Sequence, residues 1–304
     1  MPDAPSKPAL AEGLTLALVA LACIAFQVWL PTTHVKDNDY QAAVEVLNAH
    51  AQPGDVLLLN PWWSERARLF IPESVPVVGY LGSDADPLEL NPRIWVLEQP
   101  NLPEVGRSQF WRAFSQGRTE LSSEIRLGNL SLRLYKNGRA RPVLFDARAR
   151  LAEAKVYLEL LDGSRQSCQW SGHSHRCPNG AEVLTEWREL KYQPRQCVRF
   201  FPPAQGAKLV AEFANLPAAD SVVLMGGYIW EHAVHLGGVT RSDLGLEVNG
   251  ETSTIPLPPG TDGLQRVEHK SSPAGSTVRV WVTAPNPADR EVCFELYAFG
   301  AATP

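Results

Sequence analysis

Residues 278–283 read VRVWVT and residues 291–299 read EVCFELYAF, and these two stretches decide the fold class. In both, residues alternate with the period of two that places successive side chains on opposite faces of a strand. Short apolar segments of the same kind precede them, separated by turn sequences such as Asn249-Gly250. This spacing predicts an antiparallel β-sandwich of jelly-roll type over residues 143–300.

The preceding part of the chain mixes helical and strand patterns and predicts a small α/β domain over residues 38–136. A helical pattern starts near Tyr40 and stops at Pro53-Gly54, and the apolar run DVLLL at residues 55–59 suits a strand buried on both faces. The domain closes with two apolar segments around Gly128-Asn129, which predict a hairpin. Residues 137–142 then form the predicted linker.

The N-terminal segment LTLALVALACIAFQVWL begins at Leu14, ends at Leu30 and carries no formally charged residue. About 20 apolar residues in a helix cross a bilayer, so the segment predicts a single-pass transmembrane anchor behind a tail of residues 1–13. A cleavable signal peptide and a lipoprotein lipidated at Cys23 are alternatives. The anchor reading predicts a membrane protein whose C-terminal bulk is periplasmic or otherwise extracytoplasmic.

Composition narrows the classes of function. The 304 residues carry a net charge of −5 with 44% hydrophobic content, and their 25 prolines and 22 glycines are spread along the chain. This is the composition of a folded protein with many turns, and it lacks the basic stripe that binds nucleic acid. The sequence also lacks the glycine-rich loops of nucleotide enzymes and the G-x-S-x-G elbow of hydrolases. We therefore expect no nucleic-acid partner.

Two stretches of the α/β region carry a family resemblance. DYQAAVEVLNAHAQPGDVLLLNP at residues 39–61 and RIWVLEQP at residues 93–100 resemble the extracytoplasmic C-terminal domain of lipid-linked glycosyltransferases of the dolichyl-phosphate-mannose mannosyltransferase type. One spanning segment cannot form the many-helix catalytic body of that family, so the resemblance implies a soluble domain separated from its enzyme. Residues 143–300 are similar in outline to galactose-binding-like sandwiches.

Four cysteines follow the anchor: Cys168, Cys177, Cys197 and Cys293. An even number in an exported β domain predicts two disulfides, for which three connectivities exist. The favoured pairs are Cys168 with Cys177, which closes a short loop, and Cys197 with Cys293, which ties an early strand to the last one. Four reduced thiols in a cytoplasmic protein are the alternative.

Histidines near these cysteines open a metal-binding alternative, for which zinc is the cofactor. Two thiolates and two imidazoles complete a tetrahedral set, although the spacing matches no standard zinc module. A second histidine pair follows Glu231 in the order E-H-x-x-H, which differs from the H-E-x-x-H zinc helix. The candidate ligands are Cys168, His173, His175, Cys177, His232 and His235.

Tryptophans are the candidate ligand-binding residues, because exposed indoles stack on the apolar faces of sugar rings. Trp170, Trp187 and Trp230 lie in the predicted sandwich, and Trp62 and Trp63 follow a buried strand at the end where α/β clefts open. Packing in the core is the alternative reading for each of them.

These patterns predict a membrane-anchored, non-catalytic protein that binds glycan or assists the assembly of a cell-envelope polysaccharide. No catalytic residue is identified and no cofactor is predicted apart from the zinc alternative. Two other hypotheses stay open: a metal-dependent extracytoplasmic enzyme that uses the histidine-rich segments, and a structural subunit of a membrane complex.

Overall fold

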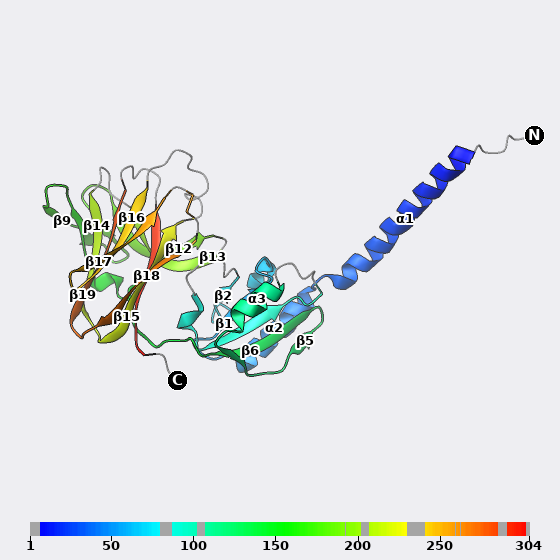
Figure 1. Ribbon diagram of the computed structural model, residues 1–304, viewed down its shortest axis with the longest axis horizontal. Coiled ribbons are helices and arrows are strands. Elements are labelled where there is room, and N and C mark those ends of the chain that lie inside the picture. The colour runs from blue at the N-terminus through cyan, green and yellow to red at the C-terminus, as the bar shows by residue number, and fades with distance from the viewer. Residues whose placement is uncertain are drawn as a thin grey trace, which may run out of the picture.

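The computed structural model contains three parts that follow one another along the chain: a long N-terminal helix, an α/β domain and a two-sheet β-sandwich (Figure 1). Most of the described secondary structure is β. The structure describes residues 7–79, 87–101, 107–191, 193–201, 207–229, 241–258, 260–261, 263–284 and 291–301.

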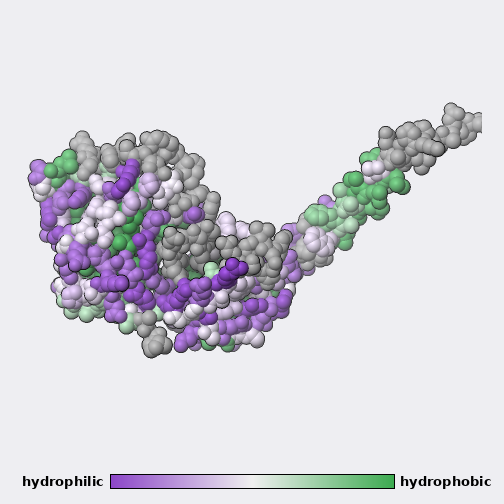
Figure 2. Space-filling model, viewed as in Figure 1, coloured by the Kyte–Doolittle hydropathy of each residue, from purple (hydrophilic) through white to green (hydrophobic). Residues whose placement is uncertain are grey.

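The first helix, α1 (Lys7–Thr33), is 27 residues long and projects away from both domains (Figure 1). Its apolar side chains face solvent, with Leu16 71% and Trp29 57% exposed. Figure 2 shows this stretch as a hydrophobic rod next to more polar domains. Across the part of the chain that the structure describes, no helix reaches the length and apolarity needed to cross a membrane. The predicted anchor at residues 14–30 is therefore not supported by the structure.

The α/β domain is built on one mixed sheet, which we call sheet A. Its strands run in the order β2-β1-β3-β6-β4, with β5 also paired to β6. β1 is parallel to β2 and β3, whereas β6 is antiparallel to β3. The elements are α2 (Asp37–His50), β1 (Val56–Asn60), η1 (Glu65–Leu69), β2 (Val77–Val78), η2 (Pro87–Leu90), β3 (Arg93–Glu98), α3 (Arg107–Phe114), β4 (Arg118–Glu120), β5 (Ile125–Leu127) and β6 (Leu130–Asn137).

Helices cover both faces of sheet A, which explains the continuous apolar run in β1. Tyr40 and Leu47 of α2 pack with Leu57 on one face, and Phe114 of α3 packs with Leu58 on the other. All residues of β1 are buried, as predicted for a central strand of this kind. The predicted hairpin is also present between β5 and β6, where Gly128 adopts a positive φ of 61°.

Among the described residues, the sandwich consists of two antiparallel sheets. Sheet B has the order β10-β11-β12-β13-β20-β15-β18, with β7 paired to β20, and sheet C has the order β17-β16-β19-β14-β8-β9. The elements are β7 (Val143–Asp146), η3 (Leu151–Glu153), β8 (Lys155–Glu159), β9 (Arg165–Ser167), β10 (Gln169–Trp170), β11 (Ser174–Arg176), β12 (Glu182–Leu190), β13 (Gln193–Phe201), β14 (Lys208–Leu216), β15 (Ala219–Tyr228), β16 (Ser242–Val248), β17 (Glu251–Leu257), β18 (Gln265–Ser272), β19 (Ser276–Thr283) and β20 (Val292–Phe299).

The inner faces of sheets B and C form the main core. In β19 the alternation behaves as predicted, since Val278, Val280 and Val282 are buried in this core and the residues between them are half-exposed. β20 differs, because all eight of its residues are buried. Its second face packs into a separate apolar cluster, against which Leu90 of the α/β domain lies. Arg148 over Tyr297 and Arg141 over Phe299 also cover this face, which alternation alone leaves open to solvent.

Polar contacts reinforce the junction between the domains. Arg266 of β18 hydrogen-bonds to Glu89 of η2 (Nη2 to Oε2, 3.2 Å) and to Glu268 (2.9 Å). Arg141, which lies between β6 and β7, donates to Glu268 at 3.0 Å. Leu90, next to Glu89, is the apolar contact described above. The contact between Arg266 and Glu89 thus links the two domains, and Arg141 joins the segment between them to β18.

Both favoured disulfides are present, which confirms the predicted pairing. Cys168 is joined to Cys177 over nine residues, and Cys197 of β13 is joined to Cys293 of β20 over 96 residues. The second bond links neighbouring strands of sheet B beneath the α/β domain. Cross-linking residues so distant in sequence restricts the unfolded chain strongly.

Candidate functional site

The outer face of sheet C carries an aromatic residue at its centre. Alternation in β19 sends Trp281 to this face, opposite the buried valines. In the strand register Trp281 lies between Val210 of β14 and Gly245 of β16. The indole therefore stands on the middle strands of the sheet and not at its edge.

Gly245 makes room for the indole. A Cβ atom at position 245 would lie 1.9 Å from Cε2 and 2.1 Å from Cζ2 of Trp281, so the ring rests on the backbone of β16. Any larger residue at 245 would push the ring away. The half-buried indole of Trp281 thus lies against the backbone of β16 at Gly245.

Charged groups flank the indole on both sides. On one side Arg279 bridges two carboxylates, at 2.8 Å from Glu212 and 3.0 Å from Glu247. On the other side the Lys208 ammonium lies over the indole of Trp281, 4.9 Å from the ring centroid, and pairs with Glu159 at 3.7 Å. Planar guanidinium and carboxylate groups are strong hydrogen-bond partners for hydroxyls, so the face combines an apolar platform with polar contacts of both signs.

The predicted tryptophans are scattered over the molecule. Trp187 of β12 is 64% exposed, Trp170 of β10 is 40% exposed and Trp63 is 50% exposed, while Trp62 is half-buried. Trp170 packs against the imidazole of His175 with ring centroids 4.8 Å apart. The fifth candidate, Trp230, lies outside the described residues. The described candidates do not converge on one site.

The structure leaves no thiolate for the zinc set expected at residues 168–177. The disulfide between Cys168 and Cys177 consumes both thiolates. His175 is buried and its Nε2 lies 2.9 Å from the carbonyl oxygen of Leu151, and burial lowers the pKa of its imidazole. His173, in contrast, is exposed in the loop.

The E-H-x-x-H stretch falls outside the described residues, so the structure places neither His232 nor His235. Within the ranges that the structure covers, no group of three or more histidine, cysteine or acidic side chains is arranged to hold a metal ion. The metal-dependent hypothesis therefore gains no geometric support from the described residues.

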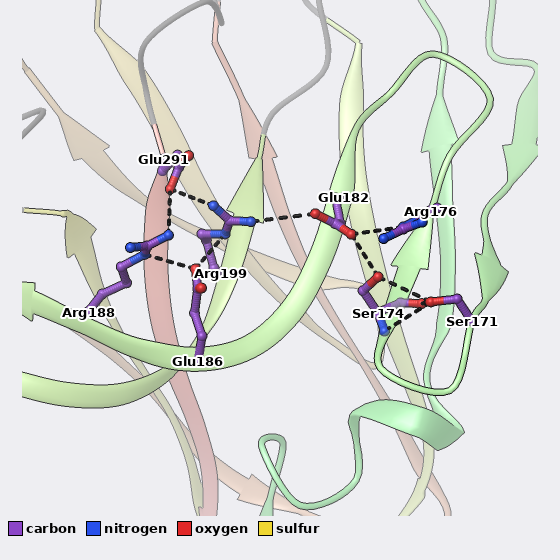
Figure 3. Close-up of polar contacts among 8 residues, drawn as sticks. All are labelled: Ser171, Ser174, Arg176, Glu182, Glu186, Arg188, Arg199 and Glu291. Atoms are coloured by element: carbon purple, nitrogen blue, oxygen red, sulfur yellow. Dashed lines mark hydrogen bonds and ion pairs between the residues drawn. The ribbon is translucent and has the colours of Figure 1, made fainter.

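A chain of ion pairs covers the hairpin formed by β12 and β13 (Figure 3). Its charged members are Arg176, Arg188, Arg199, Glu182, Glu186 and Glu291. Arg199 is the hub, at 2.6 Å from Glu186, 2.9 Å from Glu291 and 3.5 Å from Glu182. Three guanidinium groups face three carboxylates, so the charges of the network cancel. Such a network stiffens the hairpin and leaves little net charge for a ligand.

Some carboxyl groups have pKa values shifted in the direction that favours their charged form. Among the described residues, every carboxyl pKa that is shifted is shifted downward. A hydrogen bond from Ser174 lowers the pKa of Glu182. Burial opposes ionisation of Glu268, but hydrogen bonds from two arginines and a serine outweigh it and lower its pKa to about 2. Burial likewise opposes ionisation of Glu295, but the charge of Arg195 and its hydrogen bond lower the pKa of Glu295. A general acid at neutral pH needs the opposite shift.

Trp281 is the residue that the candidate set missed, although a signal for it existed. In VRVWVT the valines take one face of the strand, so Trp281 and Arg279 must share the other face. Gly245 also matters, because it makes room for the indole. Its position opposite Trp281 depends on the strand register, which no local sequence pattern specifies.

No family model and no curated protein matches the chain. Solved structures match parts of it. CBM51 from Clostridium perfringens GH95, in complex with methyl-galactose, is 10% identical at a TM-score of 0.24, covering 48% of this chain and 79% of that one. A family 35 carbohydrate binding module from Clostridium thermocellum is 15% identical at 0.26, covering 39% and 88%.

A third match is the CBM36-1 domain of a multidomain xylanase from the hindgut metagenome of Trinervitermes trinervoides, which is 15% identical at a TM-score of 0.24 and covers 40% of this chain and 91% of that one. These neighbours are carbohydrate-binding modules at low identity. None of the comparisons supports the resemblance of residues 38–136 to lipid-linked glycosyltransferases.

Proposed function

We propose that this chain is a non-catalytic glycan-binding protein that holds a saccharide on the outer face of sheet C. The observation that carries the proposal is the half-buried indole of Trp281, which lies against Gly245 with charged groups beside it. Saccharide sites combine an apolar surface with a few polar groups that fix orientation. The exposed part of this face offers both.

The chemistry of a sugar ring fits the arrangement around Trp281. The C–H face of a pyranose is apolar and stacks on an indole, whereas its equatorial hydroxyls point outward in the ring plane. Arg279 donates hydrogen bonds and Glu247 accepts them, so neighbouring hydroxyls of one ring find partners of both kinds. A sugar ring that stacks on Trp281 displaces the Lys208 ammonium from above the indole, and Lys208 keeps Glu159 as its partner.

We also propose that the protein works outside the cytoplasm, tethered by α1, as an accessory of cell-envelope polysaccharide assembly. Two disulfides support an oxidising compartment. The exposed apolar surface of α1, with Leu16 and Val28 each about seven-tenths exposed, supports insertion into lipid. Alkaline carbonate should leave the full chain in the membrane fraction and release a chain lacking residues 7–33. Release of the full chain would contradict the tether.

A glycan array printed with envelope polysaccharides tests the binding function. The full-length protein in detergent should bind a subset of glycans, and Trp281→Ala should remove that binding. Trp187→Ala is the matched control, because it deletes an equally large and more exposed indole elsewhere on the sandwich. Binding by neither wild type nor control would count against the proposal, as would equal binding by wild type and Trp281→Ala.

A further inference from the structure

The connection between α1 and the α/β domain is short and packed. α1 ends at Thr33 and α2 begins at Asp37, so the two helix ends are no more than about 14 Å apart even if the chain between them is fully extended. Within this connection, Val35 packs against the core of the α/β domain. Figure 1 shows α1 leaving the domain at the end where α2 begins.

The turn between β5 and β6 holds this connection in place. Asn129 donates from Nδ2 to the carbonyl oxygen of His34 at 2.8 Å and from its backbone N–H to Asp39 Oδ2 at 3.3 Å. The backbone N–H of Lys36 donates to the same Oδ2 at 3.0 Å. A Cβ atom at Gly128 would lie 2.1 Å from Asp39 Oδ1, so the turn is in direct contact with that carboxylate. Residues 34–39 therefore form a fixed joint between α1 and the α/β domain.

The short helix η1 lies beside the joint. Arg66 Nη2 is 2.6 Å from Asp37 Oδ1, and the ring of Phe70 stacks on Tyr40 with centroids 5.0 Å apart. Side chains three residues apart in a 3₁₀ helix lie above one another, so Leu69 is on the same side of η1 as Arg66. Leu69 is 80% exposed. An open leucine thus stands on the face of the domain that adjoins the end of α1.

A lipid surface fits this face. The exposed apolar surface of α1 extends to Trp29, and the joint fixes the domain on the helix that carries this surface. A bilayer that holds α1 is therefore brought against the face next to the joint. There the charges of Arg66 and Asp37 cancel and their side chains stay among water and headgroups, while an apolar side chain enters the boundary with the acyl chains.

We propose that the α/β domain rests on the bilayer through the side of η1 that carries Leu69, and that the joint gives the domain one fixed orientation on the membrane. The inference rests on the proposed tether by α1 and uses no residue of sheet C. Because the ion pair beside Leu69 is neutral, the contact depends on apolar insertion, and we expect it in zwitterionic and anionic lipid alike.

Spin labels on the full-length protein in phosphatidylcholine nanodiscs test this contact. In a Cys23→Ser background, a label at Leu69→Cys should collide more often with oxygen, which concentrates in lipid, than with a water-soluble nickel complex. Leu161→Cys is the matched control, because Leu161 is 84% exposed on the sandwich, and its label should show the opposite preference. Nanodiscs that contain phosphatidylglycerol should give the same result. A label on Cys23 itself, which is exposed on α1, reports whether the helix is in lipid.

Gly128→Ala tests the joint. The new Cβ would lie 2.1 Å from Asp39 Oδ1, so the turn and the joint must separate, and the Leu69 label should become more accessible to nickel. Gly250→Ala is the control for backbone strain, because its φ is also positive but no atom lies within 4 Å of the new Cβ. It should leave the Leu69 label unchanged. Thermal unfolding shows whether both variants fold, and the label in the unaltered turn tests the lipid contact without them.

The outcomes separate this inference from the tether. A Cys23 label in lipid together with a Leu69 label that prefers nickel overturns the inference and leaves the tether standing. A Cys23 label that prefers nickel overturns both. Contact of Leu69 only in nanodiscs with phosphatidylglycerol overturns the apolar basis of the contact, and a Leu69 label that Gly128→Ala leaves unchanged overturns the fixed joint.

Discussion

Gly245→Ala tests whether the indole of Trp281 rests on the strand as described. The new Cβ would lie 1.9 Å from the ring, so the ring must rotate off β16. Overpacking of this kind costs about 1–3 kcal/mol, and the half-buried position of the ring places the cost toward the lower end. A ring turned away from the sheet can no longer serve as a flat platform, so glycan binding should fall together with the free energy of unfolding.

A double-mutant cycle isolates the contact between the two residues. In a Trp281→Ala background the clash is absent, and Gly245→Ala should then be neutral or stabilising by up to about 1 kcal/mol, since alanine is favoured over glycine within a strand. Urea unfolding of the four proteins gives the coupling energy, which we expect to be at least about 1 kcal/mol. An equal cost of Gly245→Ala in both backgrounds would refute the described packing.

Three further predictions concern stability. Glu295→Gln leaves Arg195 buried without its carboxylate, 2.5 Å away in the native protein, and should cost about 3–5 kcal/mol in urea unfolding; a cost below 1 kcal/mol would contradict the pair. Folding lowers the pKa of Glu268 to about 2, so the stabilisation by its carboxylate is complete above its ordinary pKa and is lost as the pH falls toward 2. In Glu268→Gln the free energy of unfolding should therefore depend less on pH between pH 4.5 and about 2. An unchanged pH profile would refute this. Opening the Cys197–Cys293 disulfide by serine replacement should cost about 4–5 kcal/mol in the chain-entropy model, measured by denaturant unfolding without reductant, and an unchanged midpoint would argue that the bond does not form.

The sequence predicts the sandwich well because its signals are local. Period-two alternation and turn residues such as Asn249-Gly250 specify strands and their ends, and Asn249 and Gly250 do adopt positive φ in the turn between β16 and β17. The even cysteine count predicts two disulfides, and of the three possible connectivities the favoured one is present. The strands and turns follow from short-range sequence patterns, and the number of disulfides follows from the even number of cysteines.

The remaining features depend on long-range register and on the docking of domains. The contact of the Trp281 indole with the backbone requires Gly245 on the neighbouring strand, 36 positions earlier in the sequence. The burial of both faces of β20 depends on residues distant in sequence, such as Arg148 over Tyr297 and Leu90 of the other domain. The approach of Gln193 to Gly79 joins residues 114 positions apart. No local sequence pattern encodes such pairs of distant residues. The tryptophans in the sequence therefore indicate several separate candidate sites.

The most direct test of the central claim is calorimetric titration of the best-bound envelope glycan into wild type, Trp281→Ala and Trp187→Ala. We predict that Kd rises about tenfold or more for Trp281→Ala, which corresponds to at least about 1.4 kcal/mol, and stays within about twofold of wild type for Trp187→Ala. An unchanged Kd for Trp281→Ala, or a larger loss for Trp187→Ala, would contradict the placement of the glycan on sheet C.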